Sequence, residues 1–127
     1  MTTENEGGST TAHRQFHIGD VITVATGTLV SLRHIEAVYD LCGYMTGNDA
    51  LFTHQLPRAA RECEPALRAQ HPALIAETIP PISTMEEASE FLAALYPKYG
   101  EYVTVAPLPP GEHELIDPIV EMLDALG

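Results

Sequence analysis

Two short runs rich in β-branched residues give the clear strand signals in this chain of 127 residues. The first is Val21–Ala25, introduced by a turn at residues 17–20, and the second is Glu101–Val105. β-branched side chains favour extended backbone because they pack well on a pleated surface. The residues between the two runs have mostly helical spacing. We therefore expect an α/β fold of the α+β type, with a two-stranded or few-stranded sheet packed against about four helices.

Apolar residues recur at spacings of three and four in several segments between and after the strands, which predicts amphipathic helices. Pro65 lies inside one of these segments, where it should kink the helix or start a second one. The predicted helix ends carry cap residues or a first-turn proline: Ser31, Pro57, Thr84 and Asp117 at starts, and Gly47 at an end.

The length fits one domain, and the apolar fraction of 45% is ordinary for a folded protein. Residues 1–14 are rich in Thr, Gly, Glu and Ser, so we expect a disordered tail followed by a single domain over residues 15–127. No run of roughly 20 apolar residues predicts a membrane span. The N-terminus also has no signal-peptide core, so the expected location is the cytoplasm.

The net charge of −12 is unevenly distributed. Up to Ile75 there are eight acids and five bases, whereas ten acids face Lys98 alone from Ala76 onward. This excess disfavours direct binding to nucleic acid or to anionic membranes. It suits a basic protein partner, an imitation of a phosphate backbone that would inhibit a DNA-binding protein, or simple solubility. The candidate partner-binding residues are Glu86, Glu87 and Glu90.

The segment Phe52-Thr-His-Gln-Leu-Pro-Arg58 combines hydrogen-bonding side chains with a helix start at Pro57. Free N–H groups at a helix start favour an anion, so one interpretation is a pocket for a carboxylate, phosphate or nucleotide. The other is structural, with these side chains fastening the loop to its neighbours. A strand-to-helix turn can also hold a ligand. The candidate ligand-binding residues are Thr26, Gly27, Thr53, His54, Gln55 and Arg58.

The chain offers little for catalysis or metal binding. Cys42, His54, Cys63 and His71 are of metal-binding types, but each stands at least eight positions from the next. Both cysteines fall in apolar helical patterns, which predicts buried, unreactive thiols rather than a disulfide. We therefore expect no metal, no cofactor and no enzymatic activity.

Several longer motifs resemble a family of small tailed-bacteriophage proteins of unknown function, from about Phe16 to Leu123. They are Gly19-Asp-Val-Ile-Thr23, Thr26-Gly-x-Leu29, Tyr44-Met-Thr-Gly47, Phe52-Thr-His-Gln-Leu-Pro-Arg-Ala59, Gln70-His-Pro72 and His113-x-x-Ile-Asp-Pro118. The resemblance implies an accessory gene product that acts inside an infected bacterium, where such proteins often counter host defence.

Two functions follow as hypotheses. The first is a non-enzymatic interaction protein that acts on a host protein, such as a component of a defence system, through its acidic surface. The alternative is a small-ligand or nucleotide-binding module that uses the Thr26-Gly27 turn and the Phe52–Arg58 segment.

Overall fold

The computed structural model describes residues 13–48, 50–109, 111, 113 and 116–126. Its elements in chain order are β2 (Arg14–His17), α1 (Ile18–Thr26), α2 (Ile35–Thr46), the 3-10 turn η1 (Thr53–Gln55), α3 (Leu56–Gln70), α4 (Pro72–Ile75), α5 (Met85–Tyr99), β3 (Tyr102–Val105) and α6 (Pro118–Leu126). The combination of helices with one small sheet confirms the α+β prediction. None of the described helices is long and apolar enough to span a bilayer.

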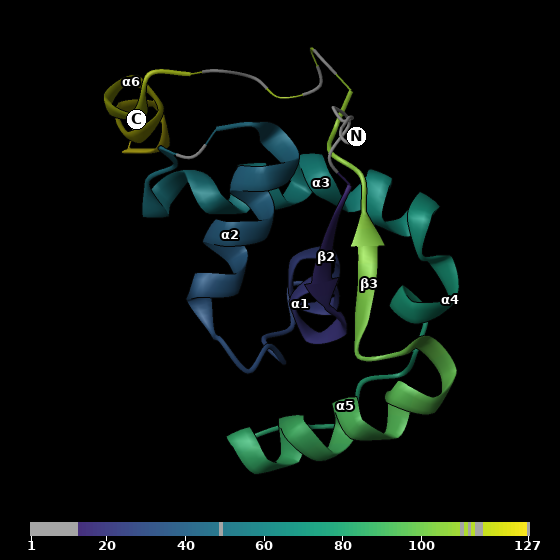
Figure 1. Ribbon diagram of the computed structural model, residues 1–127. Helices are drawn as coiled ribbons and strands as arrows, with labels where there is room; N and C mark the ends of the chain where they lie inside the picture. The colour runs from purple at the N-terminus through teal and green to yellow at the C-terminus, as the bar shows by residue number, and fades with distance from the viewer. Residues whose placement is uncertain (1–12, 49, 110, 112, 114–115, 127) are drawn as a thin grey trace.

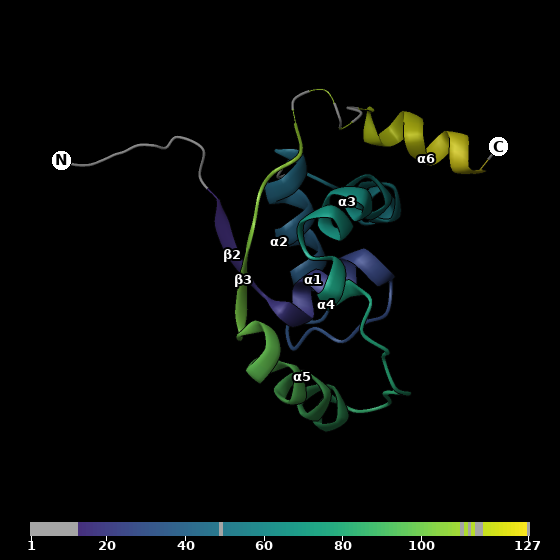
Figure 2. The ribbon, with the colours of Figure 1, turned by 90° about the vertical axis from the view of Figure 1, so that its right-hand side faces the viewer.

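Strands β2 and β3 form an antiparallel pair, with Arg14 opposite Val105 and His17 opposite Tyr102. They lie along one side of the central helices, while α5 and α6 lie at opposite ends of the molecule (Figures 1 and 2). The second predicted strand is confirmed, but its partner is β2 rather than residues 21–25. Because Arg14 already belongs to β2, ordered structure begins before residue 15; the rest of the predicted tail, residues 1–12, lies outside the described residues.

Residues 21–25 form part of helix α1, so the strand predicted there is wrong. Every residue from Ile18 to Ala25 is buried. A run buried on all sides has no polar face, and therefore its sequence shows neither the helical nor the strand period. Helix α1 packs against α2, α3, α4 and β2 and forms the centre of the core.

The start of α1 is fixed by residues that we expected to form a turn into a strand. His17 is the N-cap, and its Nδ1 accepts a hydrogen bond from the Gly19 N–H at 3.1 Å. Gly19 allows a close approach of α5, because a Cβ atom at this position would stand 2.9 Å from Leu92 Cδ1. At the other end, Gly27 has φ of 78° and caps the helix in the left-handed conformation that glycine adopts easily.

The loop between α1 and α2 is fastened by buried polar side chains. Thr23 Oγ1 accepts the N–H groups of Val30 and Ser31 at 3.0 and 2.9 Å. Ser31 is not the N-cap of α2, which begins at Ile35; instead its hydroxyl donates to Asp20 Oδ1 at 2.6 Å. These contacts supply partners for groups that would be costly to bury alone.

Other helix-end predictions are confirmed. Gly47 caps α2 with φ of 74°, and Pro57 lies in the first turn of α3. Thr84 is the N-cap of α5, as predicted, and it forms a capping box with Glu87. Helix α3 runs without a break from Leu56 to Gln70, so Pro65 does not start a second helix.

Candidate interaction surface

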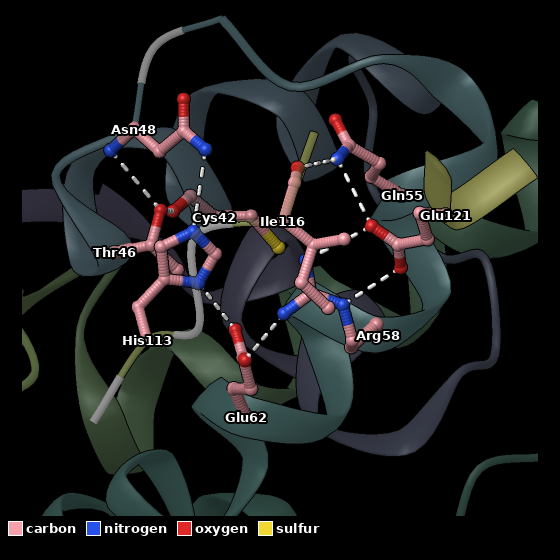
Figure 3. Close-up of polar contacts among 9 residues, drawn as sticks. All are labelled: Cys42, Thr46, Asn48, Gln55, Arg58, Glu62, His113, Ile116 and Glu121. Carbon is pink, nitrogen blue, oxygen red and sulfur yellow. Dashed lines mark hydrogen bonds and ion pairs between the residues drawn. The ribbon is translucent and has the colours of Figure 1, made fainter. Parts of the chain in front are cut away.

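The Phe52–Arg58 segment forms η1 and the first turn of α3. Its His54, Gln55 and Arg58 side chains bind the C-terminal segment, and Figure 3 shows the contacts of Gln55 and Arg58. His54 Nε2 donates to the carbonyl of Pro118 at 2.8 Å. The Gln55 amide, buried at 1% exposure, donates to the carbonyl of Ile116 at 3.2 Å and to Glu121 at 2.9 Å. Residues separated by more than sixty positions are thereby joined.

An ion-pair network extends this contact along α3. Arg58 binds both carboxylate oxygens of Glu121, at 2.7 and 3.0 Å, and reaches Glu62 at 2.8 Å. All three side chains are about 16% exposed. The hydrogen bonds from Arg58, and then that from Gln55, lower the pKa of Glu121 to about 2. The pKa of Arg58 is raised, mainly by its hydrogen bond to Glu121.

His113 adds a second attachment of the C-terminal segment. Its Nδ1 lies 2.5 Å from Glu62 Oε1, and its Nε2 lies 3.2 Å from the Asn48 amide nitrogen. The Ala50 N–H donates to Asn48 Oδ1, which leaves the NH₂ group of Asn48 facing His113. In this geometry His113 Nε2 accepts from the Asn48 amide and Nδ1 donates to Glu62. Glu62 therefore serves two attachments at once.

The other end of α3 holds the strand that leads to the same segment. The side chain of Gln70 both donates to the carbonyl of Ala106 and accepts its N–H, at 3.2 and 2.9 Å. His71 Nε2 donates to the carbonyl of Thr104 at 2.8 Å. Helix α3 thus fixes the chain after residue 100 through polar contacts at both of its ends.

Helix α6, which these contacts hold, presents four large apolar side chains to solvent. Ile119, Val120, Met122 and Leu123 are 64%, 50%, 42% and 58% exposed. We call these four residues the α6 arc. On a helix that turns about 100° per residue, Glu121 lies opposite the centre of the arc. The usual amphipathic arrangement is inverted, because Glu121 faces the body and the four apolar residues face outward.

The six residues predicted to bind a ligand do not lie at one site. Gly27 and Thr53 line one groove of about 410 Å³ between α1, α2 and the start of α3; we call it the Gly27 groove. Its described lining residues are uncharged. Thr26 donates its hydroxyl to the carbonyl of Ile22 in its own helix. His54, Gln55 and Arg58 are not among the lining residues, so the structure does not bring the six candidates together.

The predicted partner-binding acids on α5 are all exposed, but they are not equivalent. Glu87 accepts the N–H groups of Ser83 and Thr84, at 2.7 and 3.1 Å, and so caps the helix. Glu86 and Glu90 stand one turn apart at the surface. Several acids elsewhere pair with bases, including Asp20, Asp40, Glu64 and Glu77.

Cys42 and Cys63 are free, buried thiols on α2 and α3. A hydrogen bond with Cys42, together with burial, raises the pKa of Cys63. His54 and His71 are occupied by backbone carbonyls. Among the residues that the structure describes, no group of three or more His, Cys, Asp or Glu side chains is placed to hold a metal ion.

Sequence reasoning did not single out Glu62, Glu121 or the α6 arc. The i, i+4 spacing of Arg58 and Glu62 is a readable signal for a helical ion pair. The pairing of Arg58 with Glu121 has no such signal, because it depends on how the C-terminal segment folds back. The exposure of the arc is likewise a tertiary property.

A family model described as Domain of unknown function (DUF7736) matches residues 16–76, which are 61 of the 127 residues. A search of curated proteins and a search of solved structures gave no match. The matched part begins in β2 and ends just after α4, so it contains His54, Gln55 and Arg58 but not α6. Over these residues the chain is similar to a domain family whose description states no function.

Proposed function

We propose that this chain is a non-enzymatic interaction protein and that the α6 arc makes contact with its partner protein. The supporting observation is the inverted orientation of α6, with four large apolar side chains outward and Glu121 bound to Arg58 on the opposite side. Exposed apolar surface on a fixed element is costly in water unless another surface covers it. Scattered single apolar residues would need no such explanation.

The partner in this proposal is a host protein, and the site of action is the cytoplasm of an infected bacterium. Support for the host comes from the phage resemblance of the sequence motifs, which extends through His113 and Pro118 toward α6. The net charge of −12 adds long-range attraction for a basic partner. A role against a host defence system, including DNA mimicry, is compatible with this charge.

Affinity capture from bacterial lysate tests the proposal. The tagged wild-type chain is compared with Ile119→Gln/Leu123→Gln, which changes the arc, and with Leu29→Gln/Ile35→Gln. The second pair is similarly exposed, at 52% and 51%, but lies at the Gly27 groove. A partner enriched by the wild type and by the groove variant, but not by the arc variant, is the expected result.

A third variant separates charge from apolar contact. Glu86→Lys/Glu90→Lys reverses the exposed charges of α5 and spares Glu87, which caps the helix. If this variant loses the partner while the arc variant keeps it, the contact is the acidic surface of α5 rather than α6. No enriched partner at low salt would count against an interaction function altogether.

A small-ligand function is the second candidate, supported by the fact that Gly27 and Thr53 line one groove. Because the described lining residues are uncharged, the groove suits an apolar group better than a nucleotide phosphate. Thermal-shift screening with fatty acids and nucleotides compares the two. A ligand at about 100 times its Kd should stabilise the chain by about 2.7 kcal/mol, and Ile35→Gln should abolish the shift.

A further inference from the structure

We infer that the partner surface is an apolar groove between two structural elements, with basic residues along its rim, and that α6 inserts into it as a preformed helix. This inference rests on the proposed function of the α6 arc. It adds the shape and the charge of the surface that covers the arc.

The width of the arc indicates a groove. At about 100° per residue, Met122, Ile119, Leu123 and Val120 follow one another around the helix and span about 160°. A single helix lying against α6 would contact a narrower seam, as in a coiled coil. Covering the whole arc requires partner atoms on two sides. Ile119, Met122 and Leu123 also have the i, i+3, i+4 spacing of helices that bind in apolar grooves.

The length of α6 and the charge of the chain argue against a second copy as the occupant. Nine residues make a helix of about 13.5 Å. A stable flat interface uses roughly 20 to 30 residues on each side, far more than two facing α6 helices supply. Two copies would also bring together two net charges of −12. A surrounding groove instead buries a short helix deeply enough to bind it.

The charges beside the α6 arc indicate which charge the rim of the partner's groove carries. Asp124 is exposed and lies about 40° beyond Val120 around the helix. Asp117, which is also negatively charged, caps the start of the helix. Its carboxylate accepts a hydrogen bond from the Ile119 N–H at 2.8 Å. No lysine or arginine occurs from 116 to 126, and Glu121 is already neutralised by Arg58. Lysines or arginines on the rim would therefore complement the surface around the arc.

The network beneath α6 keeps the helix in place before binding. Glu121, Gln55 and His54 attach it from the side opposite the arc, so the contacts that hold it do not compete with those that bind. A helix that is already formed and oriented loses less conformational entropy on association than a disordered segment. This arrangement favours insertion over a folding-upon-binding mechanism.

A designed antiparallel two-helix protein, with a leucine-lined groove and lysines along its rim, serves as the probe. A control probe of the same design carries glutamates in place of the rim lysines. Binding of the full chain to each is measured by isothermal titration calorimetry at low and moderate salt. The arc variant Ile119→Gln/Leu123→Gln, the rim variant Asp124→Asn and the control Leu29→Gln/Ile35→Gln are compared, after thermal unfolding confirms that each is folded.

The expected result is binding to the lysine probe that weakens with salt. The arc variant should raise Kd by about a hundredfold, since two buried apolar side chains are lost, and Asp124→Asn by about twofold. The control should bind like the wild type. The inference is overturned by no binding, by equal binding to both probes, by an unaffected arc variant, or by sedimentation showing that the chain self-associates through the arc. If the chain captures a host protein through the α6 arc but does not bind the lysine probe, the proposed function stands and only the groove is refuted.

Discussion

Replacing Glu121 by glutamine should release α6 from the body without unfolding the rest of the chain. The carboxylate accepts two hydrogen bonds from Arg58 and one from Gln55. A hydrogen bond to a charged group contributes about 1 kcal/mol more than a neutral one. In the variant Arg58 still has its ion pair with Glu62, and the Arg58–Glu121 pair is partly exposed to solvent. Loss of the two charged bonds from Arg58 should therefore reduce the stability of the α6 attachment by about 1 to 2 kcal/mol.

Hydrogen exchange of the α6 amides, measured by NMR and corrected for intrinsic rates, reads this local opening directly. A change of 1 to 2 kcal/mol corresponds to roughly five- to thirtyfold faster exchange in α6. Amides of α1, at the centre of the core, should exchange as in the wild type. Glu64→Gln is the matched control, because it removes an i, i+4 pair with Arg68 that is 40% to 51% exposed and contributes little.

The pH dependence of hydrogen exchange in α6 tests the same attachment independently. The pKa of Glu121 is about 2 in the folded chain, against an ordinary value of 4.5. Because the folded pKa is depressed, its contribution is complete above pH 4.5 and is lost as the pH falls toward 2. Wild-type α6 should lose protection across this range, whereas Glu121→Gln should lack that step. Wild-type exchange rates in the glutamine variant, or the same acid step in both proteins, would refute an electrostatic attachment of α6.

Three further outcomes test the packing of the core. Thr23→Val leaves two buried N–H groups of the α1–α2 loop without an acceptor, so urea unfolding should show a free energy of unfolding lower by about 2 to 4 kcal/mol. The control Thr26→Val, at a half-buried position, should lower it by less than about 1 kcal/mol. Equal losses in the two variants would contradict this account. Gly19→Ala should cost about 1 to 2 kcal/mol, because its methyl group would press on Leu92, and an unchanged midpoint would argue against close α1–α5 packing. Cys63 is buried with a raised pKa, so its reaction with Ellman's reagent should be limited by unfolding; rapid labelling of the native chain would show the thiol to be accessible.

Local signals in the sequence predicted several elements correctly. Gly47, Pro57, Thr84 and Asp117 all occupy the helix-end positions expected of them. These predictions succeed because capping depends on the backbone within three or four residues of the cap. Strand β3 was also predicted closely, since its β-branched residues lie between clear turn signals.

The candidate site was only partly predictable. The Phe52–Arg58 segment was identified as unusual, but its partners, Ile116, Pro118 and Glu121, lie more than sixty positions later. Nothing in the spacing of residues indicates which distant carboxylate an arginine will meet. Thr53 and Gly27 were grouped with these residues, yet the structure places them at a separate groove.

By itself, the sequence determined the α+β class, most helix ends and the strongly acidic character of this protein. The tertiary structure decided that residues 21–25 are helical, because burial on every side removes the periodicity that distinguishes a helix from a strand. It also decided that β2 pairs with β3 and that the apolar face of α6 points outward. The physical reason is the same in each case: caps and turns are settled by neighbours along the chain, whereas pairing and exposure depend on which distant segments pack together.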